Sequence, residues 1–457
     1  MDTKLLKQKI LDLAIRGKLV PQDPNDEPAS VLLERIRAER EKLMAEGKLK
    51  RSKTTTDNRH YENVPFEIPE SWEWVQLGLL CSLLSTGPFG SMVHKSDYVS
   101  ANGTYIVNPA NIVDGTIMSD KLMAVSSTKA IELKRYTLQE NDIVLARRGD
   151  LSKCAVVLNS NAGWICGTGS FFLHLILVSP FYFEIFYGSD YVQTILQNRS
   201  VGATMNNLNQ NVLESIFFPL PPIAEQRRIV SQIEKYFKLI YEIDQDKIDL
   251  QEAIEQTMQK IVDLAVHGNL VKQDPHDEPA IKLLQRINPS SVPCDTSHYE
   301  NLPEGWQIAP MRMLCDLTDG DKQNGIKRIN LDVKYLRGKG DGNVLTAGRF
   351  VPANSTMILV DGENSGEVFI TPIDGYQGST FKLLNISDEI YKPFIMYVIK
   401  SHQKNFKENK VGSAIPHLNK KLFKEIDVLV PPFEEQKRIA QQIDKTLATL
   451  DTIALEL

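Results

Sequence analysis

Apolar residues repeat at heptad spacing through a long segment in the middle of the chain. From Glu225 to His267 they alternate at steps of four and three residues, and only Lys247 and Thr257 interrupt the series. The segment has no Pro or Gly, and Gly268 follows it, so the pattern predicts one long helix with an apolar seam. At 1.5 Å per residue this helix is roughly 65 Å long and can hold two domains well apart. The seam consists of Ile229, Ile233, Tyr236, Ile240, Ile243, Leu250, Ile254, Ile261 and Leu264.

A seam of this length needs a partner helix, and the two ends of the chain offer one in two pieces. The C-terminal segment Glu435–Leu457 carries the same heptad seam. Aligned by internal repeats, this segment and the N-terminal helix cover the same heptads as the central helix, apart from positions 248–251. We therefore predict that the terminal helices lie end to end, antiparallel to the central helix, and close the chain into a pseudo-twofold ring. An intermolecular coiled coil that makes a dimer is the alternative.

These repeats show that the chain is a tandem duplication. The 28 residues Lys9–Ile36 recur, roughly two-thirds identical, at Lys260–Ile287. A period near 230 residues is too long for a solenoid repeat, so we predict a duplicated domain. A duplication without functional symmetry remains the simpler alternative. Two further pairs of segments follow in the same order. His60–Asn63 with Trp72 matches His298–Asn301 with Trp306. Val201–Ile229 matches Val411–Ile439, and both of these segments contain a Pro-Pro-x-x-Glu-Gln motif.

The blocks between the repeats, about 60–218 and 298–428, resemble each other only at their ends. In both, short β-like runs between turns are followed by an amphipathic helix, near Pro180–Gln197 and near Pro393–Phe406. Two copies of one frame with unlike interiors indicate one task performed on two different targets. The expected strands are Ile143–Ala146, Ala155–Leu158 and Phe171–Val178 in the first block, and Met357–Val360, Val368–Ile370 and Thr380–Leu384 in the second.

The predicted fold class is α/β, with two similar α/β domains separated by long antiparallel coiled-coil helices in a circular arrangement. The length of 457 residues suits two domains of ordinary size with connecting helices. The expected boundaries are a helical leader at 1–50, a first domain at 51–219, the central helix with the repeated leader at 220–290, a second domain at 291–429, and a C-terminal helix at 430–457.

Composition places the chain among soluble intracellular proteins. No apolar run is long enough to span a bilayer and no signal pattern opens the chain, so we expect a cytoplasmic protein without a membrane partner. Its five cysteines form no C-x-x-C pair and have no His at ligand spacing, which indicates reduced and mostly buried thiols. These residues are Cys81, Cys154, Cys166, Cys294 and Cys315.

Charge is distributed unevenly along the chain. The net charge of −6 argues against a protein that coats nucleic acid indiscriminately. Residues 391–424, however, contain eight lysines against one acid, and residues 321–349 contain seven basic residues against three acids. The basic charge therefore gathers in the second domain. A solvated helix face explains such a lysine run equally well.

Polar turns between the expected strands supply candidate DNA-binding residues. Arg reads guanine, Asn and Gln read adenine, and Ser and Thr contact bases or phosphate. Ordinary hairpin turns are the competing interpretation for each single residue. With two lysines from the basic segments, the candidates are Arg147, Arg148, Thr168, Ser170, Lys339, Asn364, Ser365, Gln377, Ser379, Thr380 and Lys420.

No catalytic set or cofactor site is expected. Asn108–Asn111 reads Asn-Pro-Ala-Asn, which lacks the aromatic residue that stacks on a flipped base in amino-methyltransferases, so we interpret it as a turn. A Walker lysine is missing, and the histidines are scattered without partners. Glu225, Gln226 and their copies Glu435 and Gln436 follow Pro-Pro, where a carboxylate suits a helix N-terminus, so capping explains them without catalysis.

Over its whole length the chain resembles the specificity subunits of type I restriction–modification enzymes. The resemblance rests on the repeated leader (Lys9–Pro24 and Lys260–Pro275), on the Pro-x-x-Trp entries, and on Leu-Pro-Pro-x-x-Glu-Gln at 220–226. The second copy has Val430 where the first has Leu220, a mild departure. In that family two target-recognition domains each read one half of a split sequence in double-stranded DNA, and paired helices fix the spacer between them.

The resemblance also implies the partners. Such a subunit has no catalysis and no cofactor of its own, and docks two adenine-methylating subunits that carry S-adenosylmethionine, together with ATP-driven restriction nuclease subunits. Two alternatives remain open. One is a self-contained DNA methyltransferase or nuclease, which the missing cofactor loop disfavours. The other is a coiled-coil scaffold with two domains that bind something other than DNA.

Overall fold

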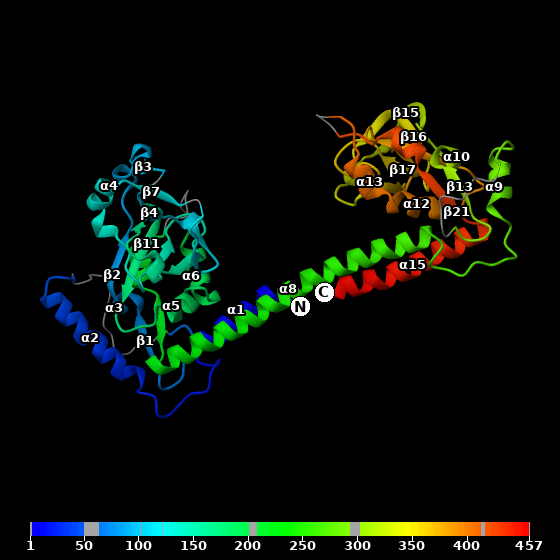
Figure 1. Ribbon diagram of the computed structural model, residues 1–457. Coiled ribbons are helices and arrows are strands. Elements are labelled where there is room, and N and C mark those ends of the chain that lie inside the picture. Colours follow the sequence, from blue (N-terminus) through cyan, green and yellow to red (C-terminus); the bar gives the residue numbers. More distant parts are fainter. Residues whose placement is uncertain are drawn as a thin grey trace. The chain divides into compact units, whose positions relative to one another are not determined.

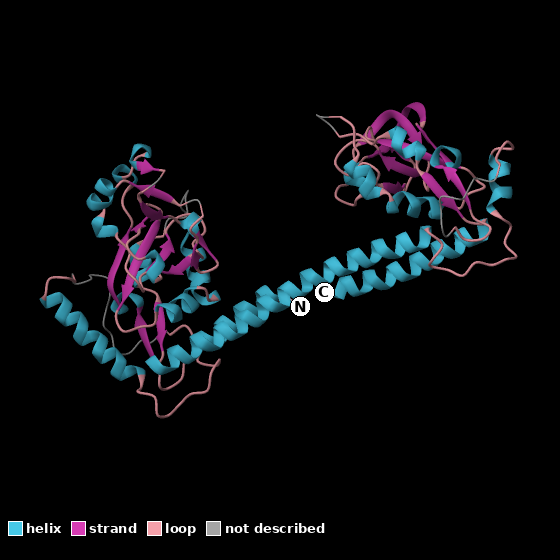
Figure 2. Ribbon diagram, viewed as in Figure 1, coloured by secondary structure: helices cyan, strands magenta, loops and turns pink. Residues whose placement is uncertain are grey.

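The computed structural model (Figure 1) describes residues 2–49, 64–100, 102–120, 122–200, 208–292, 302–412 and 416–456. The chain divides into two compact units, unit 1 (Met1–Gln245) and unit 2 (Asp246–Leu457). Both units combine helices with strands (Figure 2), which confirms the predicted α/β class. The His60–Asn63 and His298–Asn301 motifs, residues 201–207 of the third repeat, and Cys294 lie outside the described residues.

The predicted central helix is a single helix, α8 (Ile223–Val266), of 44 residues. It ends where the sequence indicates, because Gly268 has φ +78° and the N–H of Asn269 bonds back to the carbonyl of Leu264 at 2.9 Å. The C-terminal helix is α15 (Phe433–Glu456), and the N-terminal helix is α1 (Thr3–Ile15). The heptad pattern therefore located α8 and α15 to within a few residues, and the internal repeat indicated α1 near the start of the chain.

Each unit builds its core around a helix pair of equivalent sequence. In unit 1 the buried face of α1, including Ala14 and Ile15, shares one core with Ile229 and Ile233 of α8. In unit 2 the last part of α8, including Val262, shares a core with Ile439 and Ile443 of α15. Because α1 repeats the end of α8 and α15 repeats its beginning, the two pairs are copies of each other.

A two-stranded sheet closes each lobe, which we define as residues 73–220 (lobe 1) and 307–430 (lobe 2). In lobe 1 the first strand, β1 (Glu73–Gln76), pairs with the last, β12 (Phe217–Leu220). In lobe 2, β13 (Gln307–Pro310) pairs in the same way with β21 (Asp427–Val430). Each lobe therefore leaves and returns to the helices at one place.

Both lobes also contain a four-stranded sheet with the same order of strands. In lobe 1 the order is β2 (Cys81–Thr86), β11 (Ser170–Leu175), β8 (Ile143–Ala146) and β9 (Cys154–Val156). In lobe 2 it is β14 (Cys315–Thr318), β20 (Phe381–Ile386), β17 (Thr356–Leu359) and β18 (Val368–Ile370). All six expected strands belong to these two sheets, within a few residues of the expected bounds.

The remaining strands differ between the lobes. Lobe 1 adds a sheet in the order β10 (Ile165–Cys166), β4 (Thr104–Val107), β7 (Met123–Val125) and β3 (Tyr98–Val99), with a hairpin of β5 (Ile112–Val113) and β6 (Thr116–Ile117). Lobe 2 instead joins β15 (Asp321–Leu331), β16 (Val344–Val351) and β19 (Gly375–Gln377) into a closed three-stranded barrel. The two lobes thus share the two-stranded and four-stranded sheets and differ in their remaining strands.

The amphipathic helices after the sheets are each broken once, where one continuous helix was expected. In lobe 1, α5 (Pro180–Tyr187) ends at Gly188, and α6 (Asp190–Ser200) begins after Ser189, whose hydroxyl accepts the N–H of Val192. In lobe 2 the break at His402 separates α12 (Lys392–Ser401) from α13 (Gln403–Glu408). The other helices are α2 (Ala29–Ala45), α3 (Leu77–Leu80), α4 (Ser127–Glu132), α7 (Gln210–Glu214), α9 (Ala280–Ile287), α10 (Met311–Leu314), α11 (Val333–Leu336) and α14 (Lys420–Glu425).

The described cysteines are free thiols in the cores, as expected from their spacing. Cys81, Cys154, Cys166 and Cys315 are all buried, and burial raises the pKa of each thiol. Within the described ranges, no cluster of three His, Cys, Asp or Glu side chains could hold a metal ion. The described helices also include none with the length and apolar character of a bilayer span.

Candidate nucleic-acid interface

In lobe 1 the candidate residues lie on two turns that meet at one end of the four-stranded sheet. The N–H of Arg147, directly after β8, donates to the carbonyl of Gly169, directly before β11, at 2.8 Å. Arg148 is exposed, whereas Arg147 and Thr168 are half-buried. Burial, and then the charge of Arg148, lower the pKa of Arg147. The sheet therefore brings two guanidinium groups and a hydroxyl to the same end.

In lobe 2 the matched end of the sheet gathers three loops. The N–H of Val360 donates to the carbonyl of Thr380, and the N–H of Leu418 donates to the carbonyl of Val360, both at 2.8 Å. The 361–366 loop, with the half-buried Asn364, therefore lies between the turn at 377–380 and the start of α14. Ser379 and Lys420 are exposed on the two flanking segments.

The acidic side chains of this loop have basic partners within the lobe. The Nζ of Lys410 lies 2.8 Å from Oε2 of Glu363, and Nδ1 of His417 lies 2.7 Å from Oδ1 of Asp361. The charge of Lys410 offsets the repulsion that a bare Glu363 carboxylate would exert on a phosphate backbone. Seven of the eight lysines of residues 391–424 are exposed, which suits either a solvated face or a phosphate contact.

Three predicted contacts are not supported by the structure. Ser170 and Ser365 are completely buried, and the hydroxyl of Ser170 bonds to the carbonyl of Val107 at 3.4 Å. The amide of Gln377 is used inside the lobe, where it donates to Asp319 and Phe381 and accepts from the N–H of Gly320. These turns fold inward at the three positions, so we leave them out of the interface. Lys339 is exposed after α11, and no described contact joins it to the other candidates.

Sequence reasoning missed the ribbon formed by β15 and β16. Its strands pair from Asp321 with Phe350 to Ile329 with Val344, with an irregularity between Asn324 and Arg328. A two-stranded ribbon of this kind fits the DNA major groove. The excess of basic residues in 321–349 was the available signal, but mixed charge and Gly325 hide the alternation of a strand. The ribbon exposes Asp321, Lys322, Asn324, Gly325, Ile326, Lys327, Val344, Leu345, Thr346 and Ala347.

A buried junction connects each lobe to its helix. In unit 1 the indole Nε1 of Trp72 donates to Oε2 of Glu225 at 2.9 Å, and Nε2 of Gln22 donates to Oε1 of the same carboxylate at 2.5 Å. Glu225 is only 1% exposed. Burial raises its pKa, although both hydrogen bonds oppose this change. One carboxylate thus joins the leader, the start of the lobe and the first turn of α8.

Unit 2 repeats this junction with equivalent residues. Trp306 donates to Oε2 of Glu435 at 3.1 Å, and Gln273 donates to Oε1 at 3.2 Å. Glu435 is fully buried, and burial raises its pKa as well. The expected position in the first turn of a helix is correct for both carboxylates. Their partners, however, are Trp and Gln side chains from other segments, and simple capping does not describe them.

The neighbouring Gln and an ion pair complete the junction in both units. Gln226 accepts the N–H of Ser179 at 2.9 Å and donates to the carbonyl of Pro221, so the helix is also bonded to the segment that precedes α5. Gln436 makes the same two bonds, with Tyr391 and Pro431. Asp26 pairs with Arg228 and Asp277 with Arg438, each at 2.6 Å. The three repeated motifs therefore meet at one place in each unit.

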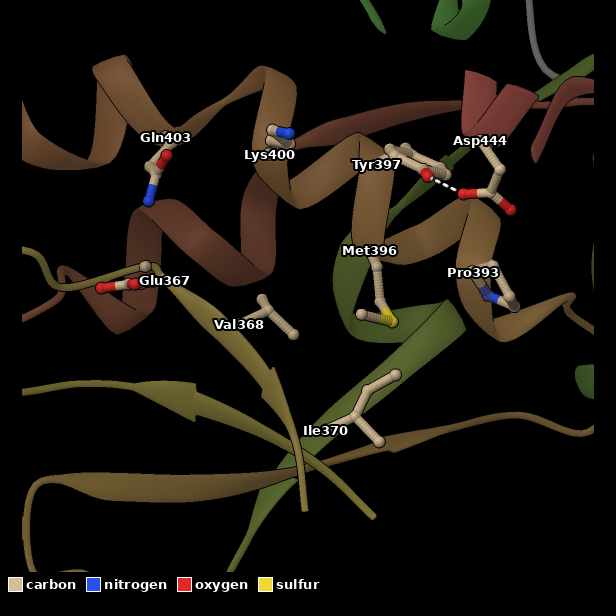
Figure 3. Close-up of a pocket in the computed structure, with 10 residues that line it drawn as sticks. Glu367, Val368, Ile370, Pro393, Met396, Tyr397, Lys400, Gln403 and Asp444 are labelled. Carbon is tan, nitrogen blue, oxygen red and sulfur yellow. Dashed lines mark hydrogen bonds between the residues drawn. The ribbon is translucent and has the colours of Figure 1, made fainter. Parts of the chain in front are cut away.

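Unit 2 also has a hollow of about 550 Å³ between lobe 2 and α15 (Figure 3). It is lined by β18, α12 and α15, and Met396 and Ile370 point into it from two sides. The hydroxyl of Tyr397 on α12 bonds to Asp444 on α15. Burial, and then this bond, raise the pKa of Tyr397. The bond adds a second attachment of lobe 2 to α15.

Comparison with known proteins agrees with the duplicated organisation. A family model described as type I restriction modification DNA specificity domain matches residues 69–253 and 303–456. The EcoAI specificity subunit of Escherichia coli is 24% identical over 98% of this chain and 90% of its own length. The EcoEI specificity subunit of the same organism is 30% identical over 63% of this chain and 55% of its own length.

Two solved structures share the fold. One, described as the structural basis underlying complex assembly and conformational transition of the type I R-M system, has a TM-score of 0.61 at 19% identity and covers 86% of this chain and 94% of its own. The other, the HsdS subunit from Thermoanaerobacter tengcongensis, has a TM-score of 0.54 at 20% identity, with the same coverage. At this level of identity the likeness concerns the fold.

Proposed function

The chain belongs to the type I restriction–modification DNA specificity family, and on this premise we propose that it reads a bipartite target in duplex DNA with its two lobes. Each lobe reads one half-site through the loops at the end of its four-stranded sheet. Lobe 2 also inserts the β15–β16 ribbon. The proposed contacts are Arg147, Arg148 and Thr168 in lobe 1, and Lys339, Asn364, Ser379, Thr380, Lys420 and the ribbon in lobe 2.

The observation that carries the proposal is the repeated junction. Both lobes are bonded to the helices by the same buried Trp–Glu–Gln set and the same Asp–Arg pair. The sheets that differ between the lobes, however, lie away from that set in the sequence, in the middle of each block. An attachment repeated in both units, with a reading part that differs between them, is what two readers of unlike half-sites require.

We propose that the spacer between the half-sites is set by the helices. In this proposal the terminal helices α1 and α15 would meet end to end along α8, so that the chain imitates a twofold dimer. Pseudo-twofold symmetry in the protein then mirrors the opposed half-sites, as it does for dimeric DNA-binding proteins. The domain boundaries at about 51–219 and 291–429 belong to the same proposal.

In this proposal the partner subunits catalyse the methylation and the cleavage of DNA. Two methyltransferase subunits carrying S-adenosylmethionine dock on the chain, one near each half-site, and restriction subunits join them in the cytoplasm. The chain itself orients DNA and partners and performs no bond-breaking step. A scaffold with lobes for other ligands is less favoured, because loops at matched ends of matched sheets present basic side chains in both lobes, beside a hydroxyl in lobe 1 and an amide in lobe 2.

Coexpression with a methyltransferase subunit of the type I class tests the proposal. Modified adenines are mapped genome-wide by long-read sequencing in cells with and without this chain. We expect methylation at one split sequence that depends on the chain. Methylation without sequence preference, or methylation by the purified chain with S-adenosylmethionine alone, would contradict it.

A further inference from the structure

The two units differ at one matched position beside the junction. The bonds from Ser179 to Gln226 and from Tyr391 to Gln436 align the segments before α5 and α12. Two residues earlier, unit 1 has Leu177 and unit 2 has Glu389. The repeated leader separately aligns Arg35 of α2 with Arg286 of α9, and Glu27 with Glu278.

In unit 2 the arginine has two carboxylate partners. Nε of Arg286 lies 2.6 Å from Oε2 of Glu389, and Nη1 lies 2.7 Å from Oε2 of Glu278. In unit 1 Arg35 keeps the equivalent of the second bond, to Glu27. Among the described residues, nothing takes the place of Glu389, because Leu177 stands there.

Leu177 is held in an unfavourable way. Its side chain is 51% exposed, and its backbone has φ +55°, in the left-handed region that residues other than Gly rarely adopt. Burial of an exposed leucine is favourable, and a strained backbone persists only where the surrounding structure holds it. Such a residue suits a surface that becomes covered on binding.

Two hollows adjoin Leu177, both are lined by Leu177 and Arg35, and we call the two together the groove. The first, of about 460 Å³, extends to the start of α8. The second, of about 670 Å³, extends along α2. The other residues that give the groove its character are Leu32, Val178, Ile223 and Arg227 in the first hollow, and Lys42, Leu43 and His174 in the second.

The groove is preformed by a longer helix in unit 1. Helix α2 has 17 residues, whereas its counterpart α9 has 8. Arg40, in the part that α9 lacks, is buried and donates from Nη1 to the carbonyls of Cys81 at 2.6 Å and Gly78 at 3.0 Å. These bonds fix α2 on lobe 1, so the groove exists without a ligand.

We propose that this groove, defined by α2, Leu177 and the start of α8, docks a segment of the methyltransferase subunit that presents a carboxylate between apolar side chains. The carboxylate pairs with Arg35 as Glu389 pairs with Arg286, and the apolar side chains cover Leu177. Unit 2 fills its own copy of the site with Glu389. This inference rests on the proposed function, and it makes the two methyltransferase positions unequal.

Charge and polarity favour a protein segment over DNA as the occupant. Arg35, Arg227 and Lys42 line the groove, and its acid, Glu39, lies 3.5 Å from Lys42. Between them lie Leu32, Val178, Ile223 and Leu43, an apolar floor that a phosphate backbone would not cover. An acidic and apolar peptide segment matches both features.

The test replaces Leu177 with the residue of unit 2. In the variant Leu177→Glu the new carboxylate closes on Arg35 and blocks the groove. Binding of purified methyltransferase subunit to the full chain is measured by calorimetry and native mass spectrometry. We expect the affinity for one of the two copies to fall about tenfold or more, with the other unchanged. If the variant binds each of the two copies as tightly as the wild type does, the inference is overturned.

Two controls separate the possible outcomes. Glu389→Leu is the reciprocal change in unit 2 and leaves the groove of unit 1 intact. The affinity that Leu177→Glu reduces should therefore be retained in Glu389→Leu. An equal loss of that affinity in Glu389→Leu would also overturn the inference. A loss of DNA affinity by Leu177→Glu without partner would assign the groove to phosphate contacts and overturn it. If the wild-type chain binds no methyltransferase, the proposed function fails instead. Unchanged circular dichroism of the exposed-site variant confirms that it folds.

Discussion

Trp72 and Glu225 lie 153 positions apart in the chain, and the indole N–H donates to the buried carboxylate at 2.9 Å. Trp72 directly precedes the first strand of lobe 1, and Glu225 belongs to the first turn of α8. The bond therefore holds the start of lobe 1 in a fixed position relative to the first turn of α8. Trp306 and Glu435 do the same in unit 2.

Removing this carboxylate should destabilise the unit that contains it. Glu225→Ala leaves the indole N–H of Trp72 buried without its acceptor, which costs roughly 2–4 kcal/mol together with the cavity. Urea unfolding followed by hydrogen exchange should show the loss in unit 1, and Glu435→Ala should show it in unit 2. The exposed Glu234→Ala on the same helix is the control. A loss no larger than that of the control would contradict the role of the junction.

The glycine that ends each leader helix should not tolerate a side chain. Gly17 has φ +67°, and a Cβ there would lie 2.4 Å from Cγ of Pro69; Gly268 has φ +78°, with a distance of 2.5 Å to Cγ of Pro303. Gly47 also has φ +70° but no atom within 4 Å of such a Cβ. Gly17→Ala should therefore lower the free energy of unfolding by more than the roughly 1 kcal/mol expected for Gly47→Ala. Equal losses in thermal unfolding would show that the Pro69 contact is unimportant.

The half-buried Glu184 of α5 should make unit 1 pH-sensitive. Burial raises the pKa of this carboxyl to about 7. Between its ordinary pKa and 7, the folded state holds a proton that the unfolded state has lost, so stability falls as the pH rises through this window. Glu184→Gln should remove the fall and gain on the order of 1–3 kcal/mol at pH 8, with little change at pH 4.

The matched position in lobe 2 is Met396, and an apolar residue there shows that the frame needs no charge at this place. Urea unfolding from pH 4 to 8 measures the profile, with the exposed Glu140→Gln as the control. A profile of Glu184→Gln that parallels the wild type would exclude Glu184 as its source.

Substitutions in one lobe should affect one half-site. Arg148→Ala should weaken binding by about 1–3 kcal/mol and relax base preference in the half-site of lobe 1 only. Lys327→Ala on the ribbon should act only on the half-site of lobe 2, or reduce the salt dependence if the lysine contacts phosphate. Selection of DNA targets from a random library measures both. Equal loss at both half-sites would contradict the division of reading between the lobes.

Local patterns in the sequence predicted the helices and the shared frame well. The heptad seam located α8, because burial of one helix face depends only on spacing along the chain. Strands β8 and β18 were located to the residue, since short apolar runs between turns are a local signal. The repeats predicted which segments are equivalent, and they gave no indication that Trp72, Gln22 and Glu225 meet, because that contact depends on three-dimensional packing.

The candidate interface was less predictable for the same reason. Whether Ser365 or Ser379 faces outward depends on the path of its loop, and the first is buried while the second is exposed. Gln377 has the right chemistry for adenine, yet its amide is used by Asp319, Phe381 and Gly320. The ribbon of β15 and β16 was missed because its exposed strands carry charge on both faces and lack apolar alternation.

The central claim is that the helices set the distance between the two readers. One heptad inserted in α8, with a matching heptad in the terminal helix opposite, lengthens the helix by about 10 Å, or about three base pairs. Mapping methylated adenines genome-wide in cells with this variant and its methyltransferase partner should show both half-sites unchanged and the spacer altered. A seven-residue insertion after the exposed Gly47 should leave the spacer as it is. An unchanged spacer in the heptad variant, with both half-sites still methylated, would contradict the account.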